Sequence, residues 1–145
     1  MLVTAESLTG GMLGVRITAL PGSSDIFWGG IVAYSNFAKQ KLLGVNEALL
    51  SSLGPVSAEV AEAMAAGVLS YCDRSIALAV TGVAGPGGGT DTLPVGSVWI
   101  AAAVSKGDAP PESISRLYHF TGSRNRIRRE TTHRAFELAL ELLDR

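Results

Sequence analysis

Apolar and polar positions in the first half of the chain alternate with two different periods. Short runs of apolar and β-branched residues predict strands at residues 1–5, 30–34 and 76–80. Between these runs, apolar residues recur three or four positions apart, and this spacing predicts helices at residues 8–20, 35–43 and 57–72. Strands that alternate with helices in this way are typical of a parallel sheet covered by helices.

The second half of the chain has a different pattern. Two apolar segments, residues 95–104 and 113–120, are joined by the Gly- and Pro-containing stretch 105–111, which predicts an antiparallel hairpin. A final helical pattern covers residues 123–143. We therefore expect one α/β domain over residues 1–145, a three-layer α/β/α sandwich with a mixed central sheet.

Composition narrows the class of protein further. The 145 residues are 47% hydrophobic and 17% charged, with a net charge of −1, which favours a folded core and gives no electrostatic case for binding nucleic acid or an anionic membrane. No leader segment and no run of about 18 apolar residues is visible, so we expect a cytoplasmic protein. The single cysteine, Cys72, provides neither a disulfide nor a metal cluster, and we expect no metal.

Polar residues follow three of the predicted strands. Ser7 follows the first strand, Tyr34 ends the second, and Thr81 ends the third. Open α/β sheets bind ligands beyond the carboxyl ends of their strands, so loops there can bring these residues together.

Ser7 lies between a strand and a helix in the segment E-S-L-T-G-G, where a serine can cap the helix or act as a nucleophile or ligand contact. A nucleophilic serine needs a base. His119 and His133 are poor candidates, because one lies within the last strand and the other in the middle of the last helix. Lys39 follows the second strand by about one helical turn and could serve if burial lowered its pKa, although a lysine in this position is more often a solvated helix residue.

Two further segments could contact a ligand. The loop T-G-V-A-G-P-G-G-G-T, residues 81–90, contains five glycines that would allow backbone N–H groups to face a ligand, or it could simply be flexible. The segment G-S-R-N-R-I-R-R places four arginines at the start of a helix, where the helix dipole disfavours cations. These arginines could bind phosphate, form ion pairs elsewhere or remain solvated, and Arg124 and Arg128 share a helical face that Arg126 does not.

Together these segments resemble the CinA C-terminal domain family, also called nicotinamide mononucleotide deamidase. The similarity is carried, in order along nearly the whole chain, by T-A-E-S-L-T-G-G, G-G-I-V-A-Y-S-N-F-A-K, V-T-G-V-A-G-P-G-G-G-T with the following P-V-G-S-V-W-I-A, and G-S-R-N-R-I-R-R. Members of this family usually have a helix and a fuller strand before the first motif, whereas Met1 lies three residues before Thr4 here. We expect the loss of such a helix to expose apolar surface on one face of the sheet.

The resemblance implies hydrolysis of nicotinamide mononucleotide to nicotinate mononucleotide and ammonia, with no cofactor. It implies Ser7 as nucleophile and Lys39 as base, and Tyr34 or Thr81 would relay protons or orient Lys39. Backbone N–H groups around Thr9, Gly10 and Gly11 are the candidates for stabilising an oxyanion. The remaining candidates would hold ribose and phosphate: Gly82, Gly85, Gly87 and Arg124. Family members commonly self-associate, so a homo-oligomer is expected.

Two other functions remain open at this point. The same domain occurs fused to other domains in family members, which is compatible with a non-catalytic nucleotide-binding accessory module. A hydrolase that acts on a different small amide would also need a serine and a base.

Overall fold

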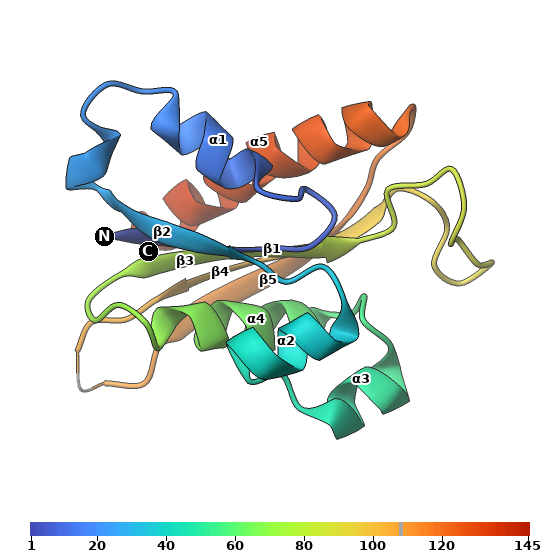
Figure 1. The fold of residues 1–145 in the computed structure, drawn as a ribbon, viewed down its shortest axis with the longest axis horizontal. Helices are drawn as coiled ribbons and strands as arrows, with labels where there is room; N and C mark the ends of the chain where they lie inside the picture. The colour runs from blue at the N-terminus through green and yellow to red at the C-terminus, as the bar shows by residue number, and fades with distance from the viewer. Residues whose placement is uncertain (108) are drawn as a thin grey trace.

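A five-stranded sheet in the order β2-β1-β3-β4-β5 forms the centre of the computed structural model, which describes residues 1–107 and 109–145 (Figure 1). β1 (Leu2–Glu6) pairs in parallel with β2 (Phe27–Val32) and with β3 (Ile76–Gly82). β4 (Ser97–Val104) and β5 (Glu112–His119) continue the sheet in antiparallel fashion. The predicted mixed sheet is thus confirmed, and the predicted hairpin joins β4 to β5 through a segment in which Asp108 lies outside the described residues.

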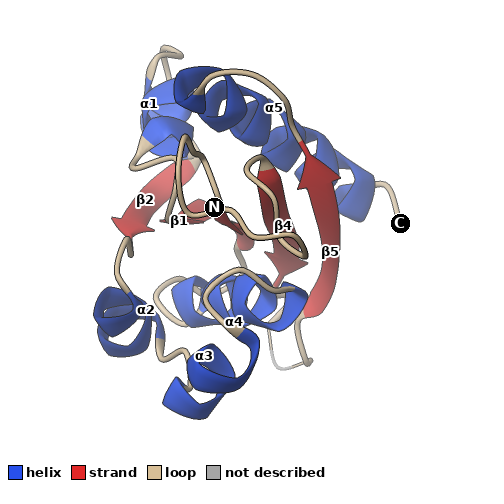
Figure 2. Cartoon of the chain, turned by 90° about the vertical axis from the view of Figure 1, so that its right-hand side faces the viewer, coloured by secondary structure: helices blue, strands red, loops and turns tan. Residues whose placement is uncertain are grey.

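Helices cover both faces of this sheet (Figure 2). α1 (Met12–Thr18) and α5 (Arg124–Leu143) lie on one face. On the other face lie α2 (Asn36–Leu43), α3 (Glu47–Leu53) and α4 (Ala58–Leu69). The expected three-layer α/β/α arrangement is therefore present. In the part of the chain that the structure describes, none of the helices has the length and apolar character needed to cross a membrane.

Strands β1, β3 and β4 contribute to two cores, because successive side chains of a strand point to opposite faces. In β3, Ala77 and Ala79 belong to the core that contains α4, whereas Leu78 and Val80 belong to the core that contains α1 and α5. The α4 face of the sheet is built mainly from small side chains, which lets this helix lie close to the strands. The alanines concerned are Ala5, Ala77, Ala79, Ala101 and Ala103.

Most predicted elements occur, and several of them begin or end a few residues from the predicted positions. α1 begins at Met12 and not at residue 8, because Gly10 and Gly11 adopt positive φ values of 59° and 101° and form a turn before it. β2 begins at Phe27, since its pairing with β1 extends further toward the amino end than the apolar run suggested. α3 was not predicted, although Asn46 caps it by accepting a hydrogen bond from the Ala48 N–H.

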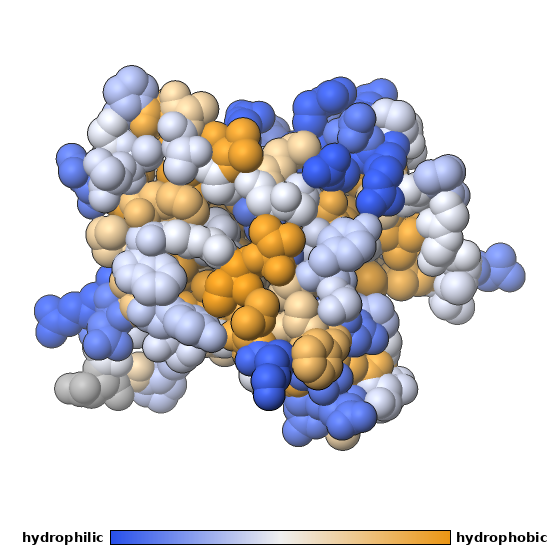
Figure 3. Space-filling view, viewed as in Figure 1, coloured by the Kyte–Doolittle hydropathy of each residue, from blue (hydrophilic) through white to orange (hydrophobic). Residues whose placement is uncertain are grey.

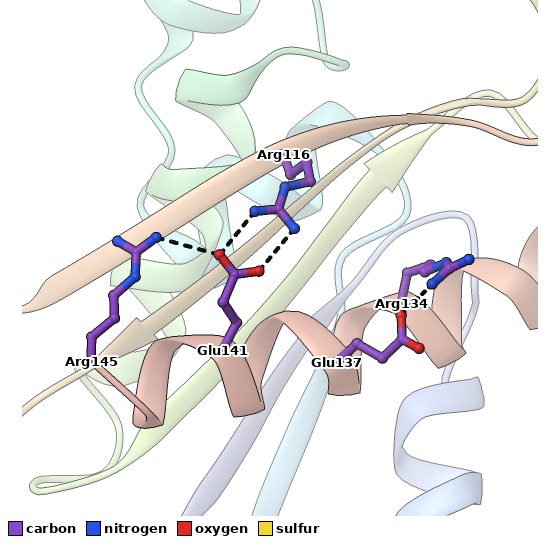
Figure 4. Close-up of polar contacts among 5 residues, drawn as sticks. All are labelled: Arg116, Arg134, Glu137, Glu141 and Arg145. Carbon is purple, nitrogen blue, oxygen red and sulfur yellow. Dashed lines mark hydrogen bonds and ion pairs between the residues drawn. The ribbon is translucent and has the colours of Figure 1, made fainter.

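One ion pair links α5 to β5, and further pairs lie along α5 (Figure 4). The Arg116 guanidinium on β5 binds both carboxylate oxygens of Glu141 at 2.9 Å, and Arg145 also reaches Glu141. Arg134 pairs with Glu137 one turn earlier on α5. Because these side chains are solvated, each pair contributes little to stability, and the buried stripe of α5 holds the helix in place.

The surface around β2 is apolar (Figure 3). β2 is an edge strand, and the side chains of Trp28, Val32 and Phe37 on or near it are 47%, 48% and 71% exposed. Hydrophilic residues gather instead over the start of α5 (Figure 3).

The close packing of α2 against α4 yields a first prediction. A Cβ atom on Gly67 of α4 would lie 2.0 Å from the Leu43 carbonyl oxygen at the end of α2. We expect Gly67→Ala to lower the free energy of unfolding by about 1–3 kcal/mol, as overpacking does. Alanine ordinarily stabilises a helix interior by up to about 1 kcal/mol relative to glycine. A loss of stability in Gly67→Ala would therefore point to the close contact and not to helix propensity.

Gly14 of α1 provides the matched control. A Cβ atom there would meet the Phe27 ring at 3.6 Å, which is an ordinary contact. We expect Gly14→Ala to be neutral or stabilising by up to about 1 kcal/mol. Urea denaturation measures both variants, and a Gly67→Ala protein at least as stable as the wild type would contradict the close approach of the two helices.

Candidate active site

Ser7 and Lys39, 32 positions apart in sequence, are in contact. The Lys39 Nζ atom lies 3.2 Å from the Ser7 Oγ atom and 3.4 Å from the Tyr34 carbonyl oxygen. Ser7 directly follows β1, and Lys39 lies in α2, which begins shortly after β2. Because β1 and β2 are parallel neighbours, their carboxyl ends lie together, at the right-hand side of Figure 1.

Burial determines the chemistry of Lys39. Its side chain is 2% exposed, and this desolvation lowers its pKa from the ordinary lysine value, because burial disfavours the charged form. Among the described residues no carboxylate forms an ion pair with it. An amine in this setting can be neutral and can accept a proton from the adjacent Ser7 hydroxyl.

The local sequence explains why α2 presents Lys39 at this point. Ser35 caps the helix by accepting a hydrogen bond from the Ala38 N–H at 3.1 Å, and the Lys39 N–H bonds to the Ser35 carbonyl. Gly44, with a φ of 65°, ends the helix one turn after Lys39. The short helix is thus fixed at both ends, and Lys39 lies on its buried side.

A cavity of about 420 Å³ opens beside the Ser7–Lys39 pair. Its size is that of a site for a small molecule. The predicted site residues that line it come from the segments after β1 and β2, from α2, from the end of β3, from the glycine loop and from the start of α5: Ser7, Tyr34, Lys39, Thr81, Gly82, Gly85, Gly87 and Arg124. The structure therefore brings these residues together, at the carboxyl ends of β1, β2 and β3.

Arg124 links three segments at this cavity. One guanidinium nitrogen donates to the Gly85 carbonyl oxygen at 2.8 Å, and another donates to the Tyr34 hydroxyl at 3.0 Å. The Tyr34 hydroxyl therefore binds Arg124, and Tyr34 contacts Lys39 through its backbone carbonyl. The orienting and proton-relay roles of Tyr34 both stay predictions.

Thr81 fixes the rim of the cavity. Its side chain is 1% exposed, and its hydroxyl donates to the Pro55 carbonyl oxygen at 2.7 Å. The loop between α3 and α4, which also lines the cavity, is thus tied to the end of β3. With its proton directed at Pro55, the Thr81 hydroxyl can only accept a hydrogen bond from a ligand.

The turn after Ser7 differs from the prediction. Thr9, Gly10 and Gly11 do not line the cavity, and the Gly10 N–H is already bound to the Ser7 carbonyl at 3.1 Å. The Gly11 N–H donates to the Glu6 carboxylate at 3.1 Å. The two glycine N–H groups therefore cannot form the expected oxyanion site. Ser7 is not the helix cap either, because Gly11 occupies the N-cap position of α1.

Glu6 is the residue that sequence reasoning missed. Its side chain is 2% exposed, and its carboxylate accepts hydrogen bonds from the Thr9 hydroxyl and from the N–H groups of Gly11, Leu13 and Gly14. It thus holds the turn and the start of α1 together. The available signal was an acidic residue at the end of an apolar strand, directly before a turn with two glycines.

The other candidates lie away from the cavity, as expected. His119 bonds to Ser97 at the end of β5, and His133 pairs with Glu137 on α5. No group of three or more His, Cys, Asp or Glu side chains suited to a metal ion occurs among the residues that the structure describes.

Comparisons with known proteins identify the family of this chain. The family model of the CinA C-terminal domain matches residues 1–143. The CinA-like protein of Mycolicibacterium paratuberculosis is 47% identical over 98% of this chain, and that of Geobacter metallireducens is 48% identical over 94%. The chain spans only 33% and 32% of these two relatives, about a third of their length.

Solved structures show the same fold. The competence/damage inducible protein CihA from Agrobacterium tumefaciens is 38% identical, with a TM-score of 0.90 over 98% of this chain and 84% of that one. A CinA superfamily protein from Escherichia coli is 34% identical, with a TM-score of 0.85 over 97% of this chain and 79% of that one. This chain belongs to the CinA C-terminal domain family.

Proposed function

We propose that this chain is an amidohydrolase that converts nicotinamide mononucleotide to nicotinate mononucleotide and ammonia. The observation that carries the proposal is the 3.2 Å contact between the Ser7 Oγ atom and the Lys39 Nζ atom, in a cavity where Lys39 is buried. The choice of substrate rests on the resemblance to the CinA C-terminal domain. The geometry of Ser7 and Lys39 supports hydrolysis through a serine nucleophile.

The reaction is an acyl transfer in two halves. Ser7 Oγ attacks the carboxamide carbon and its proton passes to Lys39 Nζ; the carbon–nitrogen bond then breaks as Lys39 returns the proton to the leaving ammonia. A water molecule next attacks the resulting ester and gives a proton to Lys39, which returns it to Ser7 Oγ. The carboxylic acid product then loses its proton to solvent.

Arg124 and the glycine loop support the choice of a phosphorylated substrate. Arg124 is exposed at the cavity, and its guanidinium can bind a phosphate through paired hydrogen bonds. Gly87 and Gly88 of the loop line the same cavity, and a Cβ atom on Gly87 would meet nothing within 4 Å. A sugar phosphate can therefore approach the loop backbone closely, with the amide directed toward Ser7.

A non-catalytic role has one observation in its favour. The chain covers about a third of the longer CinA-like proteins, so the domain can serve as an accessory to other parts of such proteins. A binding module has no need of a buried lysine with a lowered pKa beside a serine hydroxyl, however, and the contact between Ser7 and Lys39 therefore favours catalysis.

The first test concerns Ser7. We expect Ser7→Ala to lower ammonia release from nicotinamide mononucleotide by at least about 10³-fold, because the acyl-enzyme cannot form. Ser70→Ala, at an exposed serine after α4, is the control and should keep wild-type turnover. Circular dichroism should show both variants folded.

The outcomes of this test separate the two functions. Ammonia release from Ser7→Ala at a near-normal rate would exclude the nucleophile role. A wild-type protein that releases no ammonia over a range of pH and ionic strength, yet binds the nucleotide in a calorimetric titration, would instead support the accessory module.

The second test uses the lowered pKa of Lys39. We expect kcat/KM to rise with pH as the amine loses its proton and to level off below the ordinary lysine pKa. Lys39→Met should reduce turnover by about 10²–10⁴-fold, the usual contribution of a general base. Lys41→Met, at an exposed lysine of the same helix, is the control and should keep the wild-type rate and profile.

Protein stability gives an independent measure of the same group. Between the lowered pKa and the ordinary value the unfolded chain binds more protons at Lys39 than the folded chain, so the free energy of unfolding rises with pH in this window. Lys39→Met removes that dependence and should flatten the curve, whereas Lys41→Met should not. Equal slopes in all three proteins, measured by urea denaturation, would show that Lys39 is not desolvated.

The third test separates phosphate binding from chemistry. Charge-assisted hydrogen bonds are worth about 1.5–3 kcal/mol, so we expect Arg124→Met to raise KM for nicotinamide mononucleotide by about 10–100-fold. With nicotinamide riboside, which lacks the phosphate, wild type and Arg124→Met should have similar kcat/KM values. Arg126→Met, on a different face of α5, is the control, and equal losses with both substrates would contradict phosphate binding at Arg124.

A further inference from the structure

The turn that follows Ser7 is held from two sides. On one side the Glu6 carboxylate accepts hydrogen bonds from the N–H groups of Gly11, Leu13 and Gly14. On the other side Arg128 of α5 donates from Nε to the Leu8 carbonyl at 3.0 Å and from a terminal nitrogen to the Thr9 carbonyl at 2.9 Å. Donors and acceptors of this short backbone segment are thus bound by two oppositely charged side chains.

This arrangement fixes the direction of one N–H group. The carbonyl of Ser7 accepts the Gly10 N–H at 3.1 Å and so points into the turn. In a planar trans peptide the following N–H, that of Leu8, points the opposite way. Leu8 lines the cavity next to Ser7, and within the described part of the chain its N–H has no acceptor.

We propose that the Leu8 N–H stabilises the oxyanion formed when Ser7 attacks the amide, and that Arg128 is the positioning residue that aims it. This inference rests on the proposed acyl transfer. As the bond from Ser7 Oγ to the carbonyl carbon forms, the π electron pair moves to the carbonyl oxygen, and the Leu8 N–H donates to that oxygen. The N–H of the residue after a nucleophilic serine serves this purpose in other hydrolases as well.

The chemistry of arginine suits this positioning role. A guanidinium carries its donors in a rigid planar fork, so it can hold two consecutive carbonyl groups in one geometry, which a lysine ammonium cannot. A third donation, to the Asn125 side chain at 3.1 Å, fixes the orientation of the fork. Arg128 also lies in the first turns of α5, where the helix dipole disfavours a cation, so its bonds to the turn offset a local cost.

Acetylation of Ser7 by p-nitrophenyl acetate tests the assignment without the nucleotide. The rate is followed by mass spectrometry of the intact protein and of the peptide that contains Ser7. We expect Arg128→Met to slow acetylation by at least about tenfold, since loss of an oxyanion donor costs up to 10²–10³-fold and the turn here is only loosened. Arg129→Met, an exposed neighbour on the same helix, is the control and should react at the wild-type rate.

The pH profile of acetylation separates positioning from general damage. Arg128 has no contact with Lys39, so the midpoint of the profile, which reports the Lys39 pKa, should be the same in Arg128→Met and wild type. A midpoint that moves together with the rate would show that the variant disturbs the Ser7–Lys39 pair, and this would overturn the oxyanion assignment. Arg128→Lys keeps the charge and should also react slowly, which covers the case in which Arg128→Met fails to fold.

Two results overturn the inference in distinguishable ways. Wild-type rates in folded Arg128→Met or Arg128→Lys would remove the positioning role and leave the serine–lysine chemistry intact. A wild-type protein whose Ser7 is not acetylated would remove the proposed function, and the oxyanion donor with it.

Discussion

The candidate site depends on an amine that is buried without a negative partner. Removing the Lys39 ammonium from water is unfavourable, so burial lowers the pKa of this amine, whose nitrogen contacts the Ser7 hydroxyl and the Tyr34 carbonyl. The structure around it must therefore be rigid enough to prevent Lys39 from reaching solvent. The Ser35 cap, the Gly44 terminus and the close approach of α4 at Gly67 provide that rigidity.

Topology places the components of the site. From β1 the chain passes through α1 to β2 on one side, and it returns through α2, α3 and α4 to β3 on the other. The carboxyl ends of β1 and β3 consequently border a crevice, the location where open α/β sheets bind ligands. Ser7 lies at one of these ends and Thr81 at the other, while the antiparallel β4 and β5 lie on the far side of β3.

Sequence reasoning predicted the part of this site that depends on element order. Ser7 and Tyr34 follow β1 and β2, and Thr81 lies near the end of β3, so a parallel sheet is sufficient to bring them together. The spacing of Lys39 from the end of β2 likewise places it on the face of α2 toward Ser7. α3 could have been found from Asn46 and Glu47, an N-cap and an acidic first turn, but its seven residues carry too few apolar positions to show a clear period.

The individual hydrogen bonds of the site were not predictable, because they depend on residues from elements that are distant in sequence. Arg124 and Arg128 share a helical face, so the sequence does not show which of them lies at the cavity. The position of α5 against the turn after Ser7 decides this. The glycine N–H groups of the turn were expected to face a ligand, but the Glu6 and Ser7 acceptors that occupy them become visible only in three dimensions.

The arrangement of charges near Ser7 is compatible with the lowered pKa of Lys39. A carboxylate beside this amine would favour its charged form and raise its pKa, which would remove the base. Glu6 is the acidic residue adjacent to Ser7 in the chain, and its oxygens are bound instead by the Thr9 hydroxyl and three backbone N–H groups on the α1 side of the sheet. Lys39 approaches from α2, on the opposite face. The turn after Ser7 therefore binds the neighbouring carboxylate on the face of the sheet away from Lys39.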